Sequence, residues 1–584
     1  MKKIKGIAVS PGVAIGPVVV LHAEDLVVQK RPILESKIPN EIARFEDALT
    51  KTRAELLSIR KQIARDIGRD HSDIFNAHLL ILEDRTLIEE VIAKLKNEKV
   101  NVEYIFSDVL QKYTVAFSHI NDEYLKERTT DIKDVGKRVL ANLLGKPRDL
   151  LNKIEEPVVL VSHDLSPSET AMMRKDTIMG FATDIGGPTS HTAIMARSLE
   201  IPAVVGLEII SKEVFNGDTI IIDGNHGVVI INPDDKTIQL FHTEEEKFVA
   251  FVQELDKLKD VPSVTTDNIK IKLAANIESA LEIKSVISHG AEGIGLYRTE
   301  YFYMNRSDLP SEEEQYMAYR LVTEEIQPHS VVIRTLDLGG DKFSSALDIP
   351  QEMNPFLGWR AIRFCLARVD IFKTQLRAIL RASAHGNLKI MYPMISTLSE
   401  VRRANKIVEK VKEELRSEGL PFNENIDIGI MIETPSAAVT SDLLAHEVSF
   451  FSIGTNDLIQ YSLAVDRINE KIAYLYEPTH PAILRFLHQV IENAHKRNIT
   501  VSMCGEMGAN PSFAVLIIGL GIDEISTSPF LVPKIKKTIL SISLKRARLI
   551  AQECLRFSTG EEVKQYLDEQ LRLYFPEILE MSEG

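Results

Sequence analysis

One histidine lies in a segment whose residue types could carry phosphoryl chemistry. His191 follows the glycine pair Gly186-Gly187, with a strand-like run before it and helical spacing after it. Glycines at a strand-to-helix turn leave backbone N–H groups free at the helix N-terminus, where an anion is favoured. A neutral imidazole placed there could accept a phosphoryl group. The segment leaves one alternative open, a polar helix cap with an incidental histidine.

A second group of chemical residues follows the ends of strand-like runs in the C-terminal half. Arginines, carboxylates and one amide gather at these positions: Arg298, Arg334, Arg360, Arg467, Glu433, Asp457 and Asn456. Guanidinium forks match the planar oxygens of phosphate and carboxylate groups. Glu433 and Asp457 supply too few oxygens for a calcium cage, but they suit Mg²⁺, which keeps waters and takes ligands from an anionic substrate. The set predicts a small ligand with several negative charges.

Cys504 ends another of these strand-like runs. A buried, hydrophobic role is usual for a free cysteine, and we expect it for Cys365 and Cys554. Beside a metal and arginines, however, a thiol can donate a proton, since its unperturbed pKa of about 8.5 keeps it protonated at neutral pH. We therefore favour an acid over a nucleophile at Cys504.

Composition limits the class of protein. The chain of 584 residues is too long for one hydrophobic core. Its 69 basic and 84 acidic residues sum to a formal charge of −15, so we expect no nucleic-acid partner. Three widely spaced cysteines fit neither a metal knuckle nor a disulfide framework, which predicts a reducing, cytoplasmic location. Apolar runs are too short to span a bilayer, so no membrane insertion is expected.

Hydrophobic periodicity predicts a multidomain α/β protein. Residues 1–22 and 147–233 are strand-rich and are interpreted as one α/β domain. Residues 23–146 have apolar positions at helical spacing and predict an inserted helical bundle. Residues 234–262 are typical of a linker helix. Within residues 263–584, eight buried runs alternate with helical stretches, which predicts a (β/α)₈ TIM barrel with its active site at the strand ends.

The chain resembles the enzyme I family of the phosphoenolpyruvate-dependent sugar phosphotransferase system over nearly its whole length. The N-terminal half carries the motif Thr189-Ser190-His191-Thr192. The other matching segments are residues 9–12, 165–170, 295–300, 334–342, 354–358, 431–435, 454–458 and 502–507. The resemblance implies that the first α/β domain is a swivelling phosphohistidine domain and that the barrel binds phosphoenolpyruvate.

The same resemblance implies a role for each candidate residue. His191 accepts the phosphoryl group on Nε2, and the Thr170 hydroxyl orients its ring. The phosphate is held by Arg298, Arg334 and Arg360. The carboxylate side is held by Asn456 and Arg467, and Mg²⁺ by Glu433 and Asp457. Cys504 protonates the enolate carbon as pyruvate forms.

The implied partners are phosphoenolpyruvate, pyruvate and the phosphocarrier protein HPr. In such a protein the bundle docks HPr, which receives the phosphoryl group from His191 to drive sugar uptake, and the barrel forms a homodimer. Because His191 and the barrel belong to different domains, a large swing is expected to join and separate them.

Three positions depart from the family pattern. Pro188 stands where arginine is frequent, Ile459 replaces a common threonine, and residues 509–511 lack a frequent aspartate. None of these positions has an assigned chemical role, so the departures concern rate and partner choice. The sequence does not specify the downstream sugars, or whether a nitrogen-regulatory branch is served instead.

Two other interpretations remain open at this point. A relative of pyruvate phosphate dikinase or phosphoenolpyruvate synthase would need a nucleotide-binding domain, yet only 22 residues precede the bundle and no Gly-rich phosphate loop with a lysine occurs. A non-catalytic sensor of phosphoenolpyruvate would be expected to have lost the combination of His191, Glu433, Asp457 and Cys504.

Overall fold

The computed structural model consists of two compact units, Met1–Phe251 and Val252–Gly584, which we describe separately. The described residues are 1–21, 28–66, 74–118, 123–145, 154–165, 169–170, 173–174, 176–187, 192–193, 196, 199, 201–303, 308–338, 352–467, 469, 471–576 and 578. Among them, no helix is both long and apolar enough to cross a membrane.

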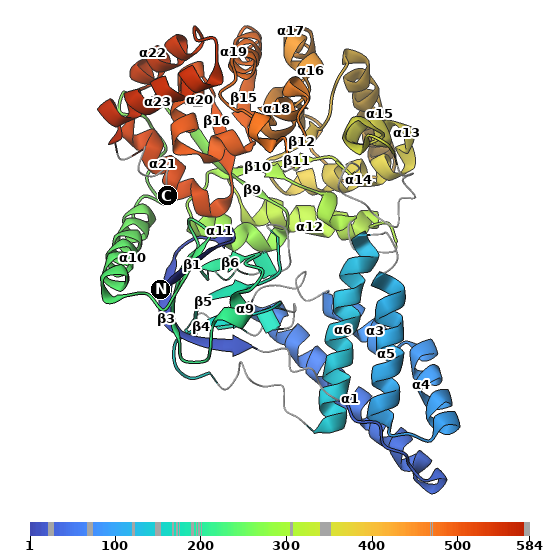
Figure 1. The fold of residues 1–584 in the computed structure, drawn as a ribbon. Helices are drawn as coiled ribbons and strands as arrows, with labels where there is room; N and C mark the ends of the chain where they lie inside the picture. Colours follow the sequence, from blue (N-terminus) through green and yellow to red (C-terminus); the bar gives the residue numbers. More distant parts are fainter. Residues whose placement is uncertain are drawn as a thin grey trace. The chain divides into compact units, whose positions relative to one another are not determined.

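A helical bundle forms part of the first unit (Figure 1). Its helices are α1 (Ile38–Asp66), α3 (Ile74–Leu82), α4 (Arg85–Glu98), α5 (Val102–Ser118) and α6 (Glu123–Leu144). Phe45 and Leu56 of α1 are fully buried in one hydrophobic cluster with Val91 of α4 and Ile105 of α5. The Asp84 side chain begins α4 by accepting a 2.7 Å hydrogen bond from the Thr86 N–H. The predicted inserted bundle is confirmed.

The first unit also contains an eight-stranded sheet. Its strands are β1 (Lys2–Lys5), β2 (Ile7–Ser10), β3 (Val13–Leu21), β4 (Val158–Ser162), β5 (Ile178–Thr183), β6 (Ala203–Val205), β7 (Thr219–Asp223) and β8 (Val228–Ile231), and the short helix α9 (Ile210–Glu213) accompanies them. The order is β1-β8-β7-β3-β4-β5-β6-β2, and β3 to β6 run parallel. Ser162 pairs with Thr183, so β4 and β5 end at one edge of the sheet. This α/β layer confirms the predicted fold class of the domain.

Helix α10 (Asp235–Asp256) crosses the boundary between the two units. It falls within the stretch 234–262 that the sequence predicts to be a linker helix. The other domain limits, at residues 22, 146 and 233, stay predictions.

The second unit contains the predicted closed barrel, with all eight strands parallel and its helices outside them (Figure 1). The strands are β9 (Lys272–Ile277), β10 (Gly293–Tyr297), β11 (Ser330–Arg334), β12 (Leu388–Tyr392), β13 (Asp427–Ile432), β14 (Phe450–Ile453), β15 (Thr500–Met503) and β16 (Glu524–Thr527). Leu296, Val332, Met431 and Phe450 pack together in the core, and Cys504 joins the same cluster.

Thirteen helices of the described part of this unit surround or extend the barrel. They are α11 (Ile283–Ser288), α12 (Glu312–Glu325), α13 (Ala361–Ala367), α14 (Val369–Ala382), α15 (Leu398–Ser417), α16 (Pro435–Val439), α17 (Ser441–Leu444), α18 (Thr455–Leu463), α19 (Pro481–His495), α20 (Pro511–Leu520), α21 (Val532–Ser541), α22 (Leu544–Cys554) and α23 (Gly560–Tyr574). Reciprocal capping boxes begin α12 at Ser311 and α15 at Thr397.

We expect Gly519→Ala to destabilise the barrel unit. A Cβ at this position of α20 would lie 2.1 Å from the carbonyl oxygen of Ala547 in α22, so the two helices would have to separate. Overpacking costs about 1–3 kcal/mol, which exceeds the gain of up to about 1 kcal/mol from alanine's helix propensity. Urea unfolding would measure the loss, with the exposed Leu549→Ala of α22 as a control. Unchanged stability of Gly519→Ala would contradict the close helix contact.

Candidate active site

The C-terminal ends of the barrel strands bring most of the predicted residues to one mouth. Arg334 ends β11, Glu433 follows β13 and Cys504 follows β15. Arg298 follows β10, Arg360 precedes α13, and Asn456 and Asp457 lie in the first turn of α18. Because all strands of the barrel are parallel, these positions share one end of it.

Arg334 is buried at this mouth between two carboxylates. Its guanidinium donates to Glu300 and lies 3.1 Å from Oδ2 of Asp337. Burial disfavours the charged form, but Glu300 and Asp337 outweigh it and raise the pKa of Arg334. The guanidinium is therefore a permanent cation, as phosphate binding requires.

Arg360 forms an ion pair with the same aspartate, Asp337. Its Nη2 donates to Oδ1 of Asp337 at 2.8 Å, and it lies 4.0 Å from Oδ2 of Asp457. Ala361, which begins α13, has a φ of 52°, a left-handed value that alanine rarely adopts. Such backbone strain is typical of functional sites, where it holds a side chain in one place.

Glu300 and Asp337 are residues of the mouth to which the sequence alone assigns no role. Both lie in the segments quoted for the resemblance, but their function as counter-ions depends on residues that are distant in the chain. A buried arginine requires a carboxylate in contact. Glu300 and Asp337 stand close to Arg298 and Arg334 in the same strand-end segments, and this proximity is the signal that could have pointed to them.

Glu433 is almost fully buried and accepts a hydrogen bond from the backbone N–H of Met394. Burial, together with the negative charges of Asp457 and Asp337, raises the pKa of Glu433 to about 8, although Arg334 acts in the opposite direction. A Cβ at Gly454 would lie 3.0 Å from Oε2 of Glu433, so glycine leaves room beside this carboxylate.

Glu433 and Asp457 fit a divalent cation. Two neighbouring carboxylates repel one another, and a cation between them would remove that cost. In the part of the chain that the structure describes, no three His, Cys, Asp or Glu side chains are grouped to hold a metal. Mg²⁺ commonly takes its remaining ligands from water or substrate, so two carboxylates are enough to hold it.

Cys504 is buried beside the same charges. Burial raises the pKa of its thiol, while a 3.3 Å hydrogen bond from Ser452 and the charge of Arg334 act against the rise. A thiol that stays protonated is suited to donating a proton and poorly suited to nucleophilic attack.

Asn456 and Arg467 lie at the outer part of the mouth. Asn456 Nδ2 donates to Oε1 of Glu506 at 2.8 Å, and Nη1 of Arg467 lies 3.5 Å from the same oxygen. Arg298 pairs at 2.6 Å with Glu278. These three residues thus have carboxylate partners at the barrel mouth.

His191 and Pro188 lie outside the described residues, so their predicted positions are not addressed by the structure. Thr170 is described and fully buried. The hydroxyl of Thr192, next to His191 in the chain, donates to the carbonyl of Leu165 at 3.1 Å. The contact expected between Thr170 and His191 stays a prediction.

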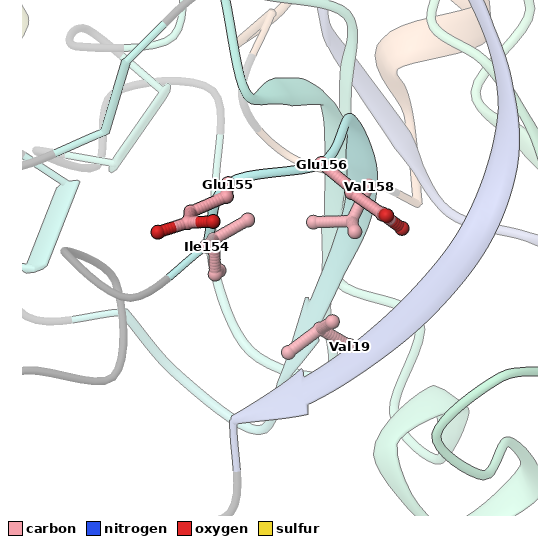
Figure 2. Close-up of a pocket in the computed structure, with 5 residues that line it drawn as sticks. All are labelled: Val19, Ile154, Glu155, Glu156 and Val158. Atoms are coloured by element: carbon pink, nitrogen blue, oxygen red, sulfur yellow. The ribbon is translucent and has the colours of Figure 1, made fainter.

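A hollow in the first unit is a separate feature, lined by Val19 of β3, Val158 of β4 and the segment 154–156. Figure 2 shows the carboxylates of Glu155 and Glu156 pointing to opposite sides of it. Its five lining residues include two carboxylates and no cation, so it does not suit an anionic substrate.

Comparison with known proteins agrees with the geometry of the barrel mouth. Three family models match the chain: the N-terminal domain of PEP-utilising enzymes at residues 5–128, their mobile domain at 154–227 and their PEP-binding domain at 252–544. The phosphoenolpyruvate-protein phosphotransferase of Staphylococcus carnosus (strain TM300) is 46% identical over 97% of this chain and 99% of its own length.

Two further relatives carry the same name. That of Staphylococcus aureus (strain MSSA476) is 47% identical over 96% of this chain and 98% of its own, and that of Geobacillus stearothermophilus is 47% identical over 97% and 98%. The chain belongs to the phosphoenolpyruvate-protein phosphotransferase family. The predicted enzyme class is confirmed, and the family to which this phosphotransferase belongs uses a divalent metal.

We expect the stability of the metal-free phosphotransferase to depend on pH through Glu433. Its pKa rises from 4.5 to about 8 on folding, so the folded state keeps a proton that the unfolded chain loses. The stabilisation is complete below pH 4.5 and is lost as pH rises to about 8, by up to about 1.4 kcal/mol per pH unit.

Glu433→Gln cannot ionise, so its stability relative to the wild type should increase between pH 5 and pH 8 and then level off. Urea unfolding in the presence of a chelator at several pH values would measure this difference. A difference that does not change with pH would show that Glu433 is not held protonated.

Proposed function

We propose that this phosphotransferase moves the phosphoryl group of phosphoenolpyruvate to Nε2 of His191 with Mg²⁺, releases pyruvate, and then phosphorylates a histidine of HPr to drive sugar uptake. The observation that carries the proposal is the sharing of Asp337 by Arg334 and Arg360, beside Glu433, Asp457 and the buried thiol of Cys504. Two fixed cations, two metal-suited carboxylates and a proton donor match the needs of an enol phosphate.

The proposed roles follow the charge that develops during the reaction. Arg298, Arg334 and Arg360 bind the phosphate, and their cations stabilise the moving phosphoryl group. Asn456 and Arg467 bind the carboxylate. When bound by Glu433 and Asp457, Mg²⁺ supplies further positive charge to the substrate oxygens.

Bond changes balance within this arrangement. The N–P bond forms at Nε2 of His191 as the bond between phosphorus and the enol oxygen breaks. The electron pair left on that oxygen becomes the carbonyl of pyruvate, and the carbon takes the proton of Cys504. Solvent then reprotonates the thiolate. Thr170 would hold the ring of His191 in the reactive orientation.

The family resemblance supports the remaining parts of the proposal. The bundle of α1 and α3–α6 would dock HPr, the barrel would form a homodimer, and the enzyme would act in the cytoplasm. Because His191 and the barrel mouth belong to separate units, the unit that carries His191 must deliver it to the substrate. Transfer of labelled phosphate to candidate carrier proteins would test the partner.

Replacing His191 with alanine should abolish phosphorylation of the chain. Labelled phosphoenolpyruvate with Mg²⁺ should give acid-labile phosphate on the wild type and none on His191→Ala. Equilibrium binding of phosphoenolpyruvate to the variant should persist, because the substrate binds at the barrel. Label retained by the variant would show that another residue is the acceptor.

Replacing Cys504 with alanine should slow pyruvate formation by about 10²–10⁴-fold, the usual contribution of a general acid. Cys554→Ala is a matched control, because this buried thiol lies at the end of α22, in a helix outside the mouth. Pyruvate release would be followed in a single turnover. If Cys504→Ala reacts at the rate of the wild type, its acid role is wrong.

A further inference from the structure

Glu506 contacts the two side chains, Asn456 and Arg467, that are proposed to hold the substrate carboxylate. Its Oε1 accepts a 2.8 Å hydrogen bond from Nδ2 of Asn456 and lies 3.5 Å from Nη1 of Arg467. Its backbone N–H donates to Oδ1 of Asn456 at 3.0 Å. One carboxylate oxygen thus faces both donors of the proposed subsite.

The approach of two loops brings Glu506 to this position. Gly505 precedes it after β15, and a Cβ on Gly505 would lie 1.9 Å from Oγ1 and 2.6 Å from the backbone nitrogen of Thr455. Only glycine therefore allows the chain after β15 to lie against the start of α18. This contact holds Glu506 beside Asn456, the next residue of α18.

The carboxylate of Glu506 is held loosely compared with those deeper in the mouth. Its side chain is 75% exposed, and that of Arg467 is 38% exposed. Exposed ion pairs contribute little to stability, typically about 0.2–1 kcal/mol. Asp337 and Glu300, by contrast, are buried with Arg334, and their separation would leave uncompensated charges. A ligand carboxylate can therefore replace Glu506 at little cost, while the buried counter-ions stay in place.

We propose that Glu506 is a placeholder for the substrate carboxylate. In the substrate-free barrel its carboxylate binds the side chains of Asn456 and Arg467. The carboxylate of an entering phosphoenolpyruvate displaces it, and it returns when pyruvate leaves. Glu506 would thereby determine specificity, because a ligand that brings no carboxylate leaves it in place. This inference rests on the proposed function, which assigns Asn456 and Arg467 to the carboxylate.

Two unreactive ligands distinguish displacement of Glu506 from a general electrostatic effect of its negative charge. Phosphoglycolate carries a phosphate and a carboxylate, whereas methyl phosphate carries the phosphate alone. Both would be titrated calorimetrically into the full chain with Mg²⁺. Glu506→Gln should bind phosphoglycolate about two- to fivefold more tightly than the wild type, the range set by an exposed ion pair. Its affinity for methyl phosphate should not change.

Glu506→Asp is the matched control variant, since it keeps the negative charge but shortens the side chain by one methylene group. It reaches the two donors less well, so it should also bind phosphoglycolate more tightly than the wild type. If the charge of Glu506 acted only through its field, Glu506→Asp would behave as the wild type does.

Three results would overturn the proposal that Glu506 is a placeholder. Equal tightening of both ligands by Glu506→Gln would indicate field repulsion. Weaker binding of phosphoglycolate would indicate that Glu506 positions the donors instead of occupying them. Unchanged binding of phosphoglycolate would indicate that no exchange takes place.

Arg467→Ala tests the underlying assignment independently of Glu506. It should weaken phosphoglycolate binding and leave methyl phosphate binding unchanged. If it leaves phosphoglycolate binding unchanged as well, the carboxylate subsite of the proposed function is wrong, whatever the Glu506 variants show.

Discussion

The sharing of one buried aspartate by two guanidinium groups is the constraint on which the barrel mouth depends. Asp337 lies 3.1 Å from Nη1 of Arg334 and 2.8 Å from Nη2 of Arg360. An arginine in a protein does not lose its proton, so burying two of them requires carboxylates in contact. Glu300 forms a second ion pair with Arg334. These carboxylates hold the guanidinium groups of Arg334 and Arg360 in fixed positions before any ligand enters. Such preorganised charge is the main source of catalysis in phosphoryl transfer.

Charge pairs at the mouth differ in how tightly they are held. Arg334 and Arg360 are paired with buried carboxylates, while Arg298 and Arg467 are paired with the exposed carboxylates of Glu278 and Glu506. Solvent screens the outer pairs and weakens them, whereas burial strengthens the inner ones. The inner pairs thus set the geometry, and the outer pairs can exchange partners when an anionic substrate binds.

Burial also determines which groups keep a proton. Glu433 and Cys504 both lie in the mouth, and removal from water raises the pKa of each. For Cys504 a raised pKa retains the proton that an enolate would need. For Glu433 a raised pKa keeps the carboxyl group neutral when no cation is near. The positive charge of a metal would lower that pKa and favour the ionised carboxylate. The same desolvation therefore serves two different chemical tasks.

Much of this protein could be predicted from local patterns in the sequence. Apolar positions at helical spacing within residues 23–146 predicted the bundle, and the alternation of apolar runs with helical stretches predicted the barrel, because hydrophobic periodicity depends only on neighbouring residues. Strand ends then placed Arg334, Glu433 and Cys504 at one rim. The roles of Glu300, Asp337 and Glu506 were decided only by the tertiary structure. Whether a carboxylate becomes a buried counter-ion or an exposed partner depends on burial and on contacts between segments far apart in the chain, and no local pattern records these.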